Sequence, residues 1–316
     1  MRRLPTPAIA AILAFAHCGA DATEGGDPLT AAIQLAASAR WNQPVEPIRI
    51  HANTYYVGVA GLSSILIRTD QGLVLLDGDL PQSVPLIEAN IRKLGFRVED
   101  IRFILNSHAH FDHAGGIAAL ARDSGAVVVA SPSGAAALRA GRAVPDDPQA
   151  GYAGATRNDP ALFPNVTTKI REIRDGESLR MGNVSITAHF TPGHTPGSTT
   201  WTWRDCADKR CFDIVYADSL NAISAPGFHF RADSDHADLT PGFRASIRKV
   251  AALPCDILLT VHPDLVDIPQ KIAQLRAGAA NNPFVDARAC QAYAHDAEQR
   301  LDARIREEEA AAAGAR

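Results

Sequence analysis

The segment that most restricts the fold of this 316-residue chain runs from Ile101 to Gly116 and reads IRFILNSHAHFDHAGG. Its first part, residues 101–107, has the apolar and β-branched composition of a buried strand. Three histidines and an aspartate follow at once, and two glycines then let the backbone turn into a helix without steric cost. Such a cluster at a strand end is either a solvated polar loop or a metal site.

The spacing within this cluster favours a metal site. Side chains two positions apart in an extended segment point to the same side, so His108 and His110 can converge on one ion. Asp112 and His113 follow after the chain turns and can face a second ion beside the first. Imidazole and carboxylate groups are zinc ligands, and a catalytic zinc takes three protein ligands plus water. Each pair therefore needs a third partner.

Two histidines elsewhere in the chain are the best candidates for the third partners. His194 lies in TPGHTPGS, a loop made rigid by prolines, and His262 lies in LLTVHPD at the end of an apolar strand. A single histidine at a strand end is more often a surface residue, but the HxHxDH motif makes ligation the better interpretation of both. Five further histidines have no comparable setting and are expected to be solvated or packing residues: His51, His189, His229, His236 and His295.

Strand and helix patterns occur in two blocks. In the first block, strands are predicted at 54–59, 63–69, 72–77, 101–107 and 126–131, and helices at 88–95 and 113–122. In the second block, strands are predicted at 168–173, 183–191, 198–204, 213–218 and 256–261, and a helix at 240–252. Two strand blocks, each with helices, predict an α+β fold in which two packed sheets carry helices outside, a four-layer αββα sandwich.

Two regions outside these elements are predicted to lack regular structure. Residues 141–166 are rich in Gly, Pro, Asp and Asn, which predicts a long loop, and long loops in compact domains are often functional. The C-terminal residues EEEAAAAGAR are expected to fray.

The N-terminus has the order of features found in secretory signal peptides. Two arginines precede the apolar run LPTPAIAAILAFA, and the small-residue pattern CGA follows. The run is too short for a membrane anchor. We therefore predict a signal peptide over 1–20, a single domain over 21–316 and a periplasmic location. The alternatives are a buried N-terminal helix, which prolines within the run disfavour, and lipidation at Cys18, which the preceding His17 fits poorly.

Export changes the interpretation of the cysteines, because an even number in an oxidising compartment suggests disulfides. Four remain after removal of the signal peptide, and three pairings are formally possible. Cys206 and Cys211 flank a short polar insert between strand-like runs, which suits a hairpin. Cys255 and Cys290 would then join a strand to the C-terminal helix. Free thiols are the alternative, and the lack of a CxxC pair disfavours a cysteine-based zinc site.

The charge pattern limits the partners. The formal net charge is -4, and the chain contains no Lys/Arg run or basic stripe, so nucleic acid is not an expected partner. No membrane span is predicted in the mature chain. We also expect the protein to be a monomer and its partner to be a small-molecule substrate.

The segments HAHFDHAGG, TPGHTPGS, YADSL and LPCDILLTVHPD resemble the metallo-beta-lactamase superfamily, and more narrowly the third, His-ligand subclass of class B beta-lactamases. The resemblance runs from about Trp41 to the C-terminus, and its motifs are specific for the fold and metal site but not for the substrate. It implies two zinc ions per chain. The first would be bound by His108, His110 and His194, and the second by Asp112, His113 and His262.

The resemblance also implies roles for the surrounding residues. A zinc-bound hydroxide attacks the lactam carbonyl, and Asp112 orients it and takes up its proton. Ser219 stands where other class B enzymes have a ligating cysteine, and with Asn221 it would hold the substrate carboxylate. Asn221 departs from the serine that is common there. Asp218 lies near the metal-bridging aspartate of glyoxalase-II-like hydrolases, but we expect it beside the ligands and not among them.

The function that this resemblance implies is zinc-dependent opening of the lactam amide of penicillins, cephalosporins and carbapenems, which gives antibiotic resistance. The alternative of the same fold is an exported zinc hydrolase acting on a thioester or lactone, as in glyoxalase II. A metal-binding protein without catalysis is a third possibility, which the six filled ligand positions disfavour. A serine beta-lactamase is excluded because no GxSxG or SxxK occurs in a catalytic setting.

Overall fold

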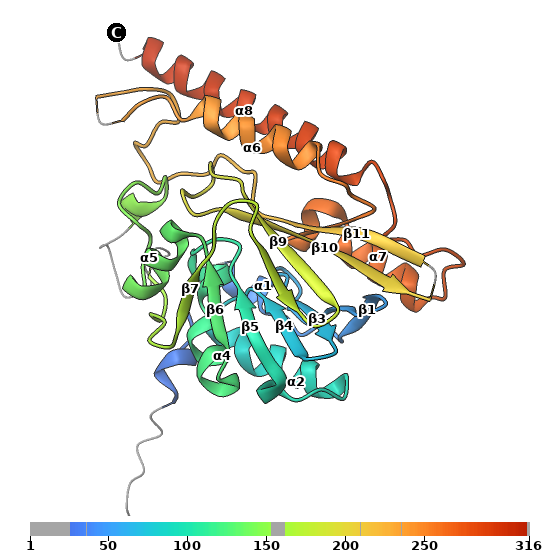
Figure 1. The fold of residues 1–316 in the computed structure, drawn as a ribbon. Helices are drawn as coiled ribbons and strands as arrows, with labels where there is room; N and C mark the ends of the chain where they lie inside the picture. Colours follow the sequence, from blue (N-terminus) through green and yellow to red (C-terminus); the bar gives the residue numbers. More distant parts are fainter. Residues whose placement is uncertain (1–25, 36, 153–161, 209, 235, 315–316) are drawn as a thin grey trace, which may run out of the picture.

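The computed structural model describes residues 26–35, 37–152, 162–208, 210–234 and 236–314. Two β-sheets lie face to face, and helices cover the outer face of each sheet (Figure 1). This arrangement confirms the expected four-layer αββα sandwich. The predicted signal peptide lies outside the described residues, as does the middle of the predicted long loop. Among the helices that are described, none is long and apolar enough to cross a membrane.

The first sheet contains seven strands in sequence order. They are β1 (Ile48–His51), β2 (Thr54–Tyr56), β3 (Ile65–Thr69), β4 (Gly72–Leu76), β5 (Ile101–Leu105), β6 (Val127–Ala130) and β7 (Ile170–Glu172). Strands β1 to β4 are antiparallel and β4 to β7 are parallel. The turn-bounded runs predicted β2, β3 and β4, whereas β1 was not predicted from the sequence. The carboxyl ends of β4, β5 and β6 therefore meet at one edge of the sheet.

The second sheet has the strand order β12-β11-β10-β9-β8. Its strands are β8 (Ser178–Met181), β9 (Val184–Phe190), β10 (Thr199–Ala207), β11 (Arg210–Ala217) and β12 (Ile257–Thr260). Only β11 and β12 are parallel to each other. The sequence prediction missed β8, a four-residue strand at the sheet edge whose side chains alternate between exposed and buried.

The helices occupy both outer layers. They are α1 (Ser38–Trp41), α2 (Val84–Lys93), α3 (Phe111–Ala114), α4 (Ile117–Ser124), α5 (Pro132–Ala140), α6 (Thr240–Ala251), α7 (Ile268–Arg276) and α8 (Ala289–Gly314). Short 3-10 helices are η1 (Pro28–Thr30), η2 (Pro81–Ser83), η3 (Val98–Asp100), η4 (Ala150–Tyr152) and η5 (Pro263–Val266). Pro132 at the first position of α5 and Pro263 at that of η5 fit a helix start, where proline lacks only an N–H that would be unbonded anyway.

Alternating side chains along the strands build the layers. In β4, Leu73 and Leu75 pack toward α2 and α4, whereas Val74 and Leu76 pack between the sheets. Strand β11 behaves in the same way: Ile214 and Tyr216 face the other sheet, and Val215 and Ala217 face α6 and α8. Because both faces of these strands are buried, their sequences are continuously apolar.

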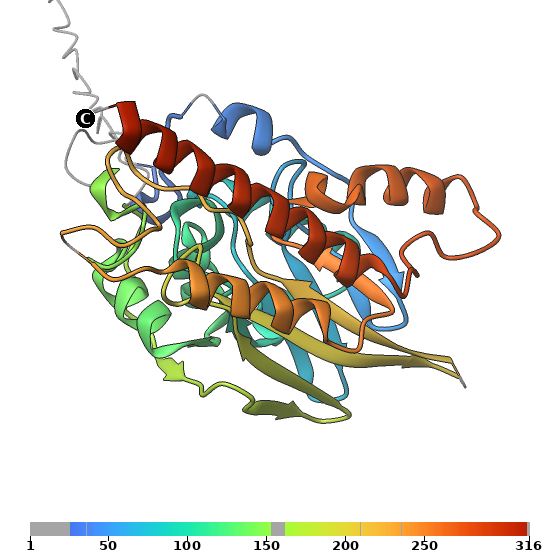
Figure 2. The same ribbon diagram turned by 90° about the horizontal axis from the view of Figure 1, so that it is seen from above.

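Helix α8 is longer than the sequence analysis expected. The tail predicted to fray is helical as far as Gly314, and α8 lies beside α6 over the second sheet (Figure 2). Glu308, in the segment EEEAAAAGAR, is 7% exposed and accepts hydrogen bonds from the backbone N–H groups of Phe230 and Arg231. Arg304, one turn earlier, also donates to it. The expectation of fraying was wrong because it ignored this tertiary contact.

Both cysteine pairs are bonded in the structure. Cys206–Cys211 closes the β10–β11 hairpin, where the two residues face each other in the strand register. Cys255–Cys290 joins the residue near the start of β12 to the first turn of α8.

Candidate metal centre

Three chain segments at one edge of the sandwich bring the six candidate ligands together. His108 and His110 follow β5, Asp112 and His113 lie in α3, and His194 lies in the β9–β10 loop. His262 follows β12 and precedes η5. The parallel pairing of β11 with β12 and of β4 with β5 directs these strand ends toward the same side. Side chains separated by up to 154 positions in the sequence therefore meet.

The first set consists of His108, His110 and His194. One ring nitrogen from each lies within 4.8 Å of the others, and all three side chains are buried. Their ring centroids are 4.8 to 5.0 Å apart with steep interplanar angles, so the rings surround a common point and do not stack. Three imidazoles in this arrangement can hold one zinc ion with a position left for water.

The second set consists of Asp112, His113 and His262. Oδ2 of Asp112 lies 3.4 Å from Nε2 of His113 and 3.5 Å from Nε2 of His262. The rings of the two histidines are 4.8 Å apart. One ligand atom each of His108, Asp112 and His113 also lies within 4.8 Å of the others, so the two sets adjoin.

Hydrogen bonds behind the first set leave one nitrogen of each ring facing inward. Nδ1 of His108 donates to Oδ1 of Asp218 at 2.6 Å, and Nδ1 of His194 donates to the Asn221 carbonyl at 2.8 Å. His110 uses the opposite nitrogen, because its Nε2 lies 3.1 and 3.2 Å from the two carboxylate oxygens of Asp147. Partners of this kind fix the tautomer and orientation of a metal-binding imidazole.

The second set is oriented in a similar way. Nδ1 of His262 lies 3.3 Å from the Gly61 carbonyl, which leaves Nε2 for a metal. Nε2 of His108 and both ring nitrogens of His113 are buried without a hydrogen-bond partner. Buried polar atoms in native proteins are almost always satisfied, so unpartnered nitrogens at the centre of both sets fit a bound cation.

Burial keeps two histidines of the first set, His108 and His194, neutral. It lowers the pKa of His108 well below its ordinary value and that of His194 to about 4, and neighbouring imidazoles add to the effect. Neutral imidazole is the form that binds zinc.

The second set contains a buried ion pair. Burial disfavours the charge on both partners, but the Asp112 carboxylate outweighs it and raises the pKa of His113 to about 9. In turn, His113 holds the pKa of Asp112 well below its usual range against the effect of burial. Without metal, His113 is therefore protonated at neutral pH.

The segment after β11 carries the predicted substrate-binding residues. The Tyr293 hydroxyl of α8 donates to the Asp218 carbonyl and accepts from the Leu220 N–H, which fixes this segment against the helix. Ser219 is 1% exposed. Asn221 is half-buried, and its side-chain oxygen has no hydrogen-bond partner.

Two residues of the predicted long loop were not identified from the sequence. Asp147 orients His110, and the side-chain amide nitrogen of Gln149 lies 3.4 Å from Nδ1 of His110 and 3.5 Å from Nε2 of His194. The amide nitrogen therefore lies beside the inward nitrogens of both rings. The only sequence signal was the unusual length of the loop.

A family model described as the metallo-beta-lactamase superfamily matches residues 57–206. The Rm3 metallo-beta-lactamase is 46% identical, with a TM-score of 0.82, over 87% of this chain and 99% of that protein. MEM-A1, a subclass B3 metallo-beta-lactamase from a soil metagenome library, is 42% identical, with a TM-score of 0.80, over 85% and 99%. The chain belongs to the metallo-beta-lactamase superfamily. Its similarity to MEM-A1 confirms the resemblance to the third subclass of the class B enzymes.

A curated relative is much less similar to this chain than the two solved structures are. The hydroxyacylglutathione hydrolase of Anaeromyxobacter dehalogenans (strain 2CP-C) is 33% identical over 102 residues, or 32% of this chain. The chain covers 29% of the length of that relative. The matched family segment contains four of the candidate ligands from the HxHxDH motif, and His194 as well, whereas His262 lies beyond it.

Proposed function

We propose that this protein is a zinc-dependent beta-lactam hydrolase that opens the lactam amide of penicillins, cephalosporins and carbapenems. The observation that carries the proposal is the position of Asp218. Its Oδ1 binds Nδ1 of His108, on the outer side of the ring, whereas Nε2 of His108 faces the other imidazoles. Oδ1 is thereby engaged by His108 and is not free to bind a metal, whereas Oδ2 of Asp218 is buried without a hydrogen-bond partner, and the Asp218→Asn variant below tests whether it binds zinc.

The candidate ligands divide into two zinc sites on this proposal. His108, His110 and His194 would hold the first ion, and Asp112, His113 and His262 the second. Bound zinc supplies an activated water and a polarised carbonyl. Water adds to the lactam carbonyl carbon, the C–N bond breaks, and the ring nitrogen takes up a proton.

The other residues of the site orient the reactants. The Asp112 carboxylate would orient the attacking water and accept its proton, because one of its oxygens lies within 4.8 Å of a ring nitrogen of His108, a member of the first set. Asn221, whose backbone carbonyl accepts a hydrogen bond from His194, would donate its side-chain N–H groups to the substrate carboxylate together with the Ser219 hydroxyl. Of these two, Asn221 is the more exposed.

We further propose that the mature protein acts in the periplasm as a monomer. The apolar N-terminal run of the sequence and the two disulfides support export, since disulfides form in oxidising compartments. Size-exclusion chromatography with light scattering and N-terminal sequencing of the periplasmic protein test both statements.

Hydrolysis of a glutathione thioester is the second candidate, and the curated relative named a hydroxyacylglutathione hydrolase favours it. The test is to assay purified mature protein, loaded with zinc, on a carbapenem, a cephalosporin and a glutathione thioester. Lactam opening that a chelator abolishes and added zinc restores is the expected result. Zinc-loaded protein that opens no lactam but cleaves the thioester would refute the proposal.

An Asp218→Asn variant separates the two candidates at the level of the metal. An asparagine still accepts the hydrogen bond from His108, so the proposal expects most of the zinc to remain bound. Loss of one zinc equivalent from this variant would identify Asp218 as a ligand, as the thioesterase candidate requires.

A further inference from the structure

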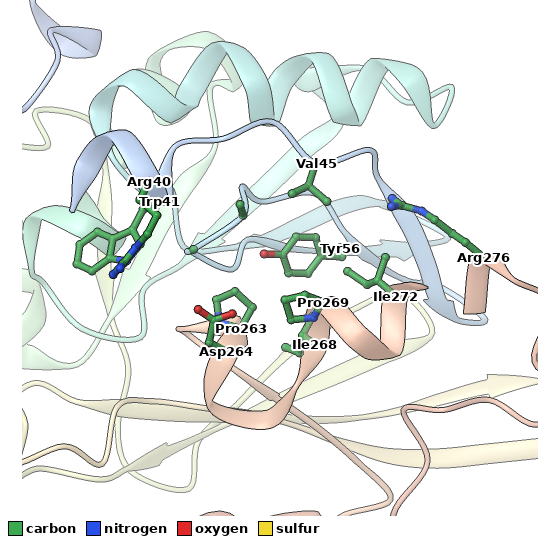
Figure 3. A pocket seen from close by; sticks show the side chains of 12 residues that line it. Arg40, Trp41, Val45, Tyr56, Pro263, Asp264, Ile268, Pro269, Ile272 and Arg276 are labelled. Carbon is green, nitrogen blue, oxygen red and sulfur yellow. The ribbon is translucent and has the colours of Figure 1, made fainter. Parts of the chain in front are cut away.

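A separate hollow adjoins the segment that follows His262, and Pro263 and Asp264 line it (Figure 3). Its volume is about 430 Å³, and it lies between the segment that follows α1 and the segment formed by η5 and α7. Cavities of roughly 300–1,000 Å³ accommodate small organic molecules. Among its described lining residues, none is one of the six candidate metal ligands.

The walls of the hollow are apolar. Val45 lies on one side and Ile268, Pro269 and Ile272 on the other, with the ring of Tyr56 between them (Figure 3). The Tyr56 hydroxyl lies 2.6 and 2.8 Å from the carbonyls of Val59 and Leu62, so it is already bonded. A molecule in the hollow would therefore contact the apolar ring of Tyr56 and not its hydroxyl.

Charged groups lie only at the ends. Arg40 stands beside Trp41 at one end, Arg276 at the other, and Asp264 near the first (Figure 3). In the described part of the chain neither arginine has an ion-pair partner, and one guanidinium N–H of Arg276 donates to the Glu46 carbonyl. Two guanidinium groups against one carboxylate leave an excess positive charge.

We propose that this hollow binds a small aromatic monocarboxylate, with its ring against Tyr56 and Ile272 and its carboxylate on Arg276. The apolar walls suit an aromatic ring, and an arginine already held by Glu46 loses less conformational freedom when it binds an anion. Arg40 adds to the positive field at the other end. A neutral ring of the same shape lacks the contact with Arg276.

The hollow also contacts the groups that orient His262. Gly61 lines it, and the Gly61 carbonyl accepts the hydrogen bond from Nδ1 of His262. Trp41 lines it as well, and its ring lies 5.4 Å from the His262 ring. A molecule that presses on Gly61 and Trp41 therefore acts on His262. This coupling rests on the proposed role of His262 as a ligand, whereas the binding site itself does not.

Direct binding to the metal-free protein tests the site. The probe is 4-iodobenzoate, whose heavy atom quenches tryptophan fluorescence on contact, and 4-iodobenzamide is the neutral control. Of the three tryptophans, Trp201 and Trp203 are buried in the sheets, so Trp41 reports the contact. We expect saturable quenching by the acid, weaker quenching by the amide, and loss of the saturable part in Trp41→Phe.

Variants locate the carboxylate. Arg276→Gln changes an exposed residue and is expected to weaken 4-iodobenzoate binding about fivefold, the size of a partly exposed ionic contact. Arg180→Gln in β8, at the sheet edge opposite β12, removes the same charge elsewhere and should have no effect. Equal affinities in wild type, Arg276→Gln and the Arg180→Gln control would overturn the site.

Zinc tests the coupling. Metal on Nε2 of His262 fixes the ring and strengthens its hydrogen bond to Gly61, so zinc-loaded protein should bind 4-iodobenzoate about threefold more tightly, a modest coupling. His262→Asn should bind the probe without responding to zinc. If zinc does not change the affinity of the wild type for 4-iodobenzoate, the coupling is refuted. Because the assay uses no substrate, neither result depends on which substrate the protein hydrolyses.

Discussion

Asp147 gives the sharpest test of how the first candidate metal site is built. Its two carboxylate oxygens lie 3.1 and 3.2 Å from Nε2 of His110, and the side chains of Asp147 and His110 are only 3% and 5% exposed. The carboxylate fixes the His110 ring and makes Nδ1 a better electron donor. Loss of a partner of this kind lowers metal affinity about 10- to 100-fold.

Two substitutions of Asp147 should weaken zinc binding by different amounts. Asp147→Asn keeps an oxygen that accepts from His110 and removes the charge, so we expect zinc to bind about tenfold more weakly, or about 1.4 kcal/mol. Asp147→Leu also leaves a buried N–H without an acceptor, and about hundredfold weaker binding is expected, or about 2.7 kcal/mol. Titration of metal-free protein against a zinc-chelating dye measures both.

The controls separate orientation of His110 from general damage. Asp146→Asn changes the neighbouring exposed carboxylate, which contacts no candidate ligand, and should leave affinity unchanged. In a His110→Asn background, Asp147→Leu should have little further effect, because the group it orients is gone. If folded Asp147→Leu binds zinc within twofold of the wild type, the reasoning fails.

Three further predictions concern stability, measured by urea unfolding of metal-free protein. Replacing Cys255 and Cys290 by alanine should cost about 4 kcal/mol and replacing Cys206 and Cys211 about 2, because their loops span 35 and 5 residues; equal costs would contradict this. Burial raises the pKa of Asp79 to about 7, so the folded state binds more protons than the unfolded state. The free energy of unfolding should therefore fall as pH rises from about 4 to 7, with Asp79 contributing at most roughly 4 kcal/mol; burial also raises the pKa of Asp77 to about 6, so Asp79→Asn should reduce the slope and leave the part due to Asp77. Gly193→Ala should cost about 2 kcal/mol, because its φ is +153° and a Cβ would lie 2.3 Å from the Phe243 ring, whereas Gly242→Ala meets nothing within 4 Å and should be tolerated.

Local sequence patterns predicted the layers well because the buried strands are short apolar runs bounded by turn residues. The runs that became β3, β4 and β5 have the composition and turn boundaries of strands, and no long-range information was needed to assign them. The prediction failed where tertiary contacts decide. The C-terminal tail is helical because Glu308 binds the backbone near Phe230, a contact 78 positions away in the sequence.

In the candidate site too, local sequence predicted some residues, whereas tertiary contacts decided the others. Spacing alone placed His108 and His110 on one side of an extended segment, and the neighbouring motif directed attention to His194 and His262. Asp147 and Gln149 were missed because a loop residue carries no periodic pattern that shows where its side chain will lie. Their roles depend on how the loop packs against the ends of β5 and β9.

The two ligand sets should respond differently to pH, because His113 of the second set holds a proton that must leave when zinc binds. Zinc requires neutral imidazole, and with the pKa of His113 at about 9 the second set releases about one proton at pH 7, whereas His194, at about 4, releases none. A gap of two pH units weakens the second site about 100-fold at pH 7.

This difference can be measured one site at a time. His262→Asn retains the first set and His110→Asn the second, and zinc affinity of each is titrated from pH 6.5 to 8.5. The second set should gain about tenfold in affinity per pH unit, and the first should stay nearly constant. If the zinc affinities of both sets rise in parallel with pH, the buried pair of Asp112 and His113 does not hold the proton. The proposed difference in protonation between the two sets would then be wrong.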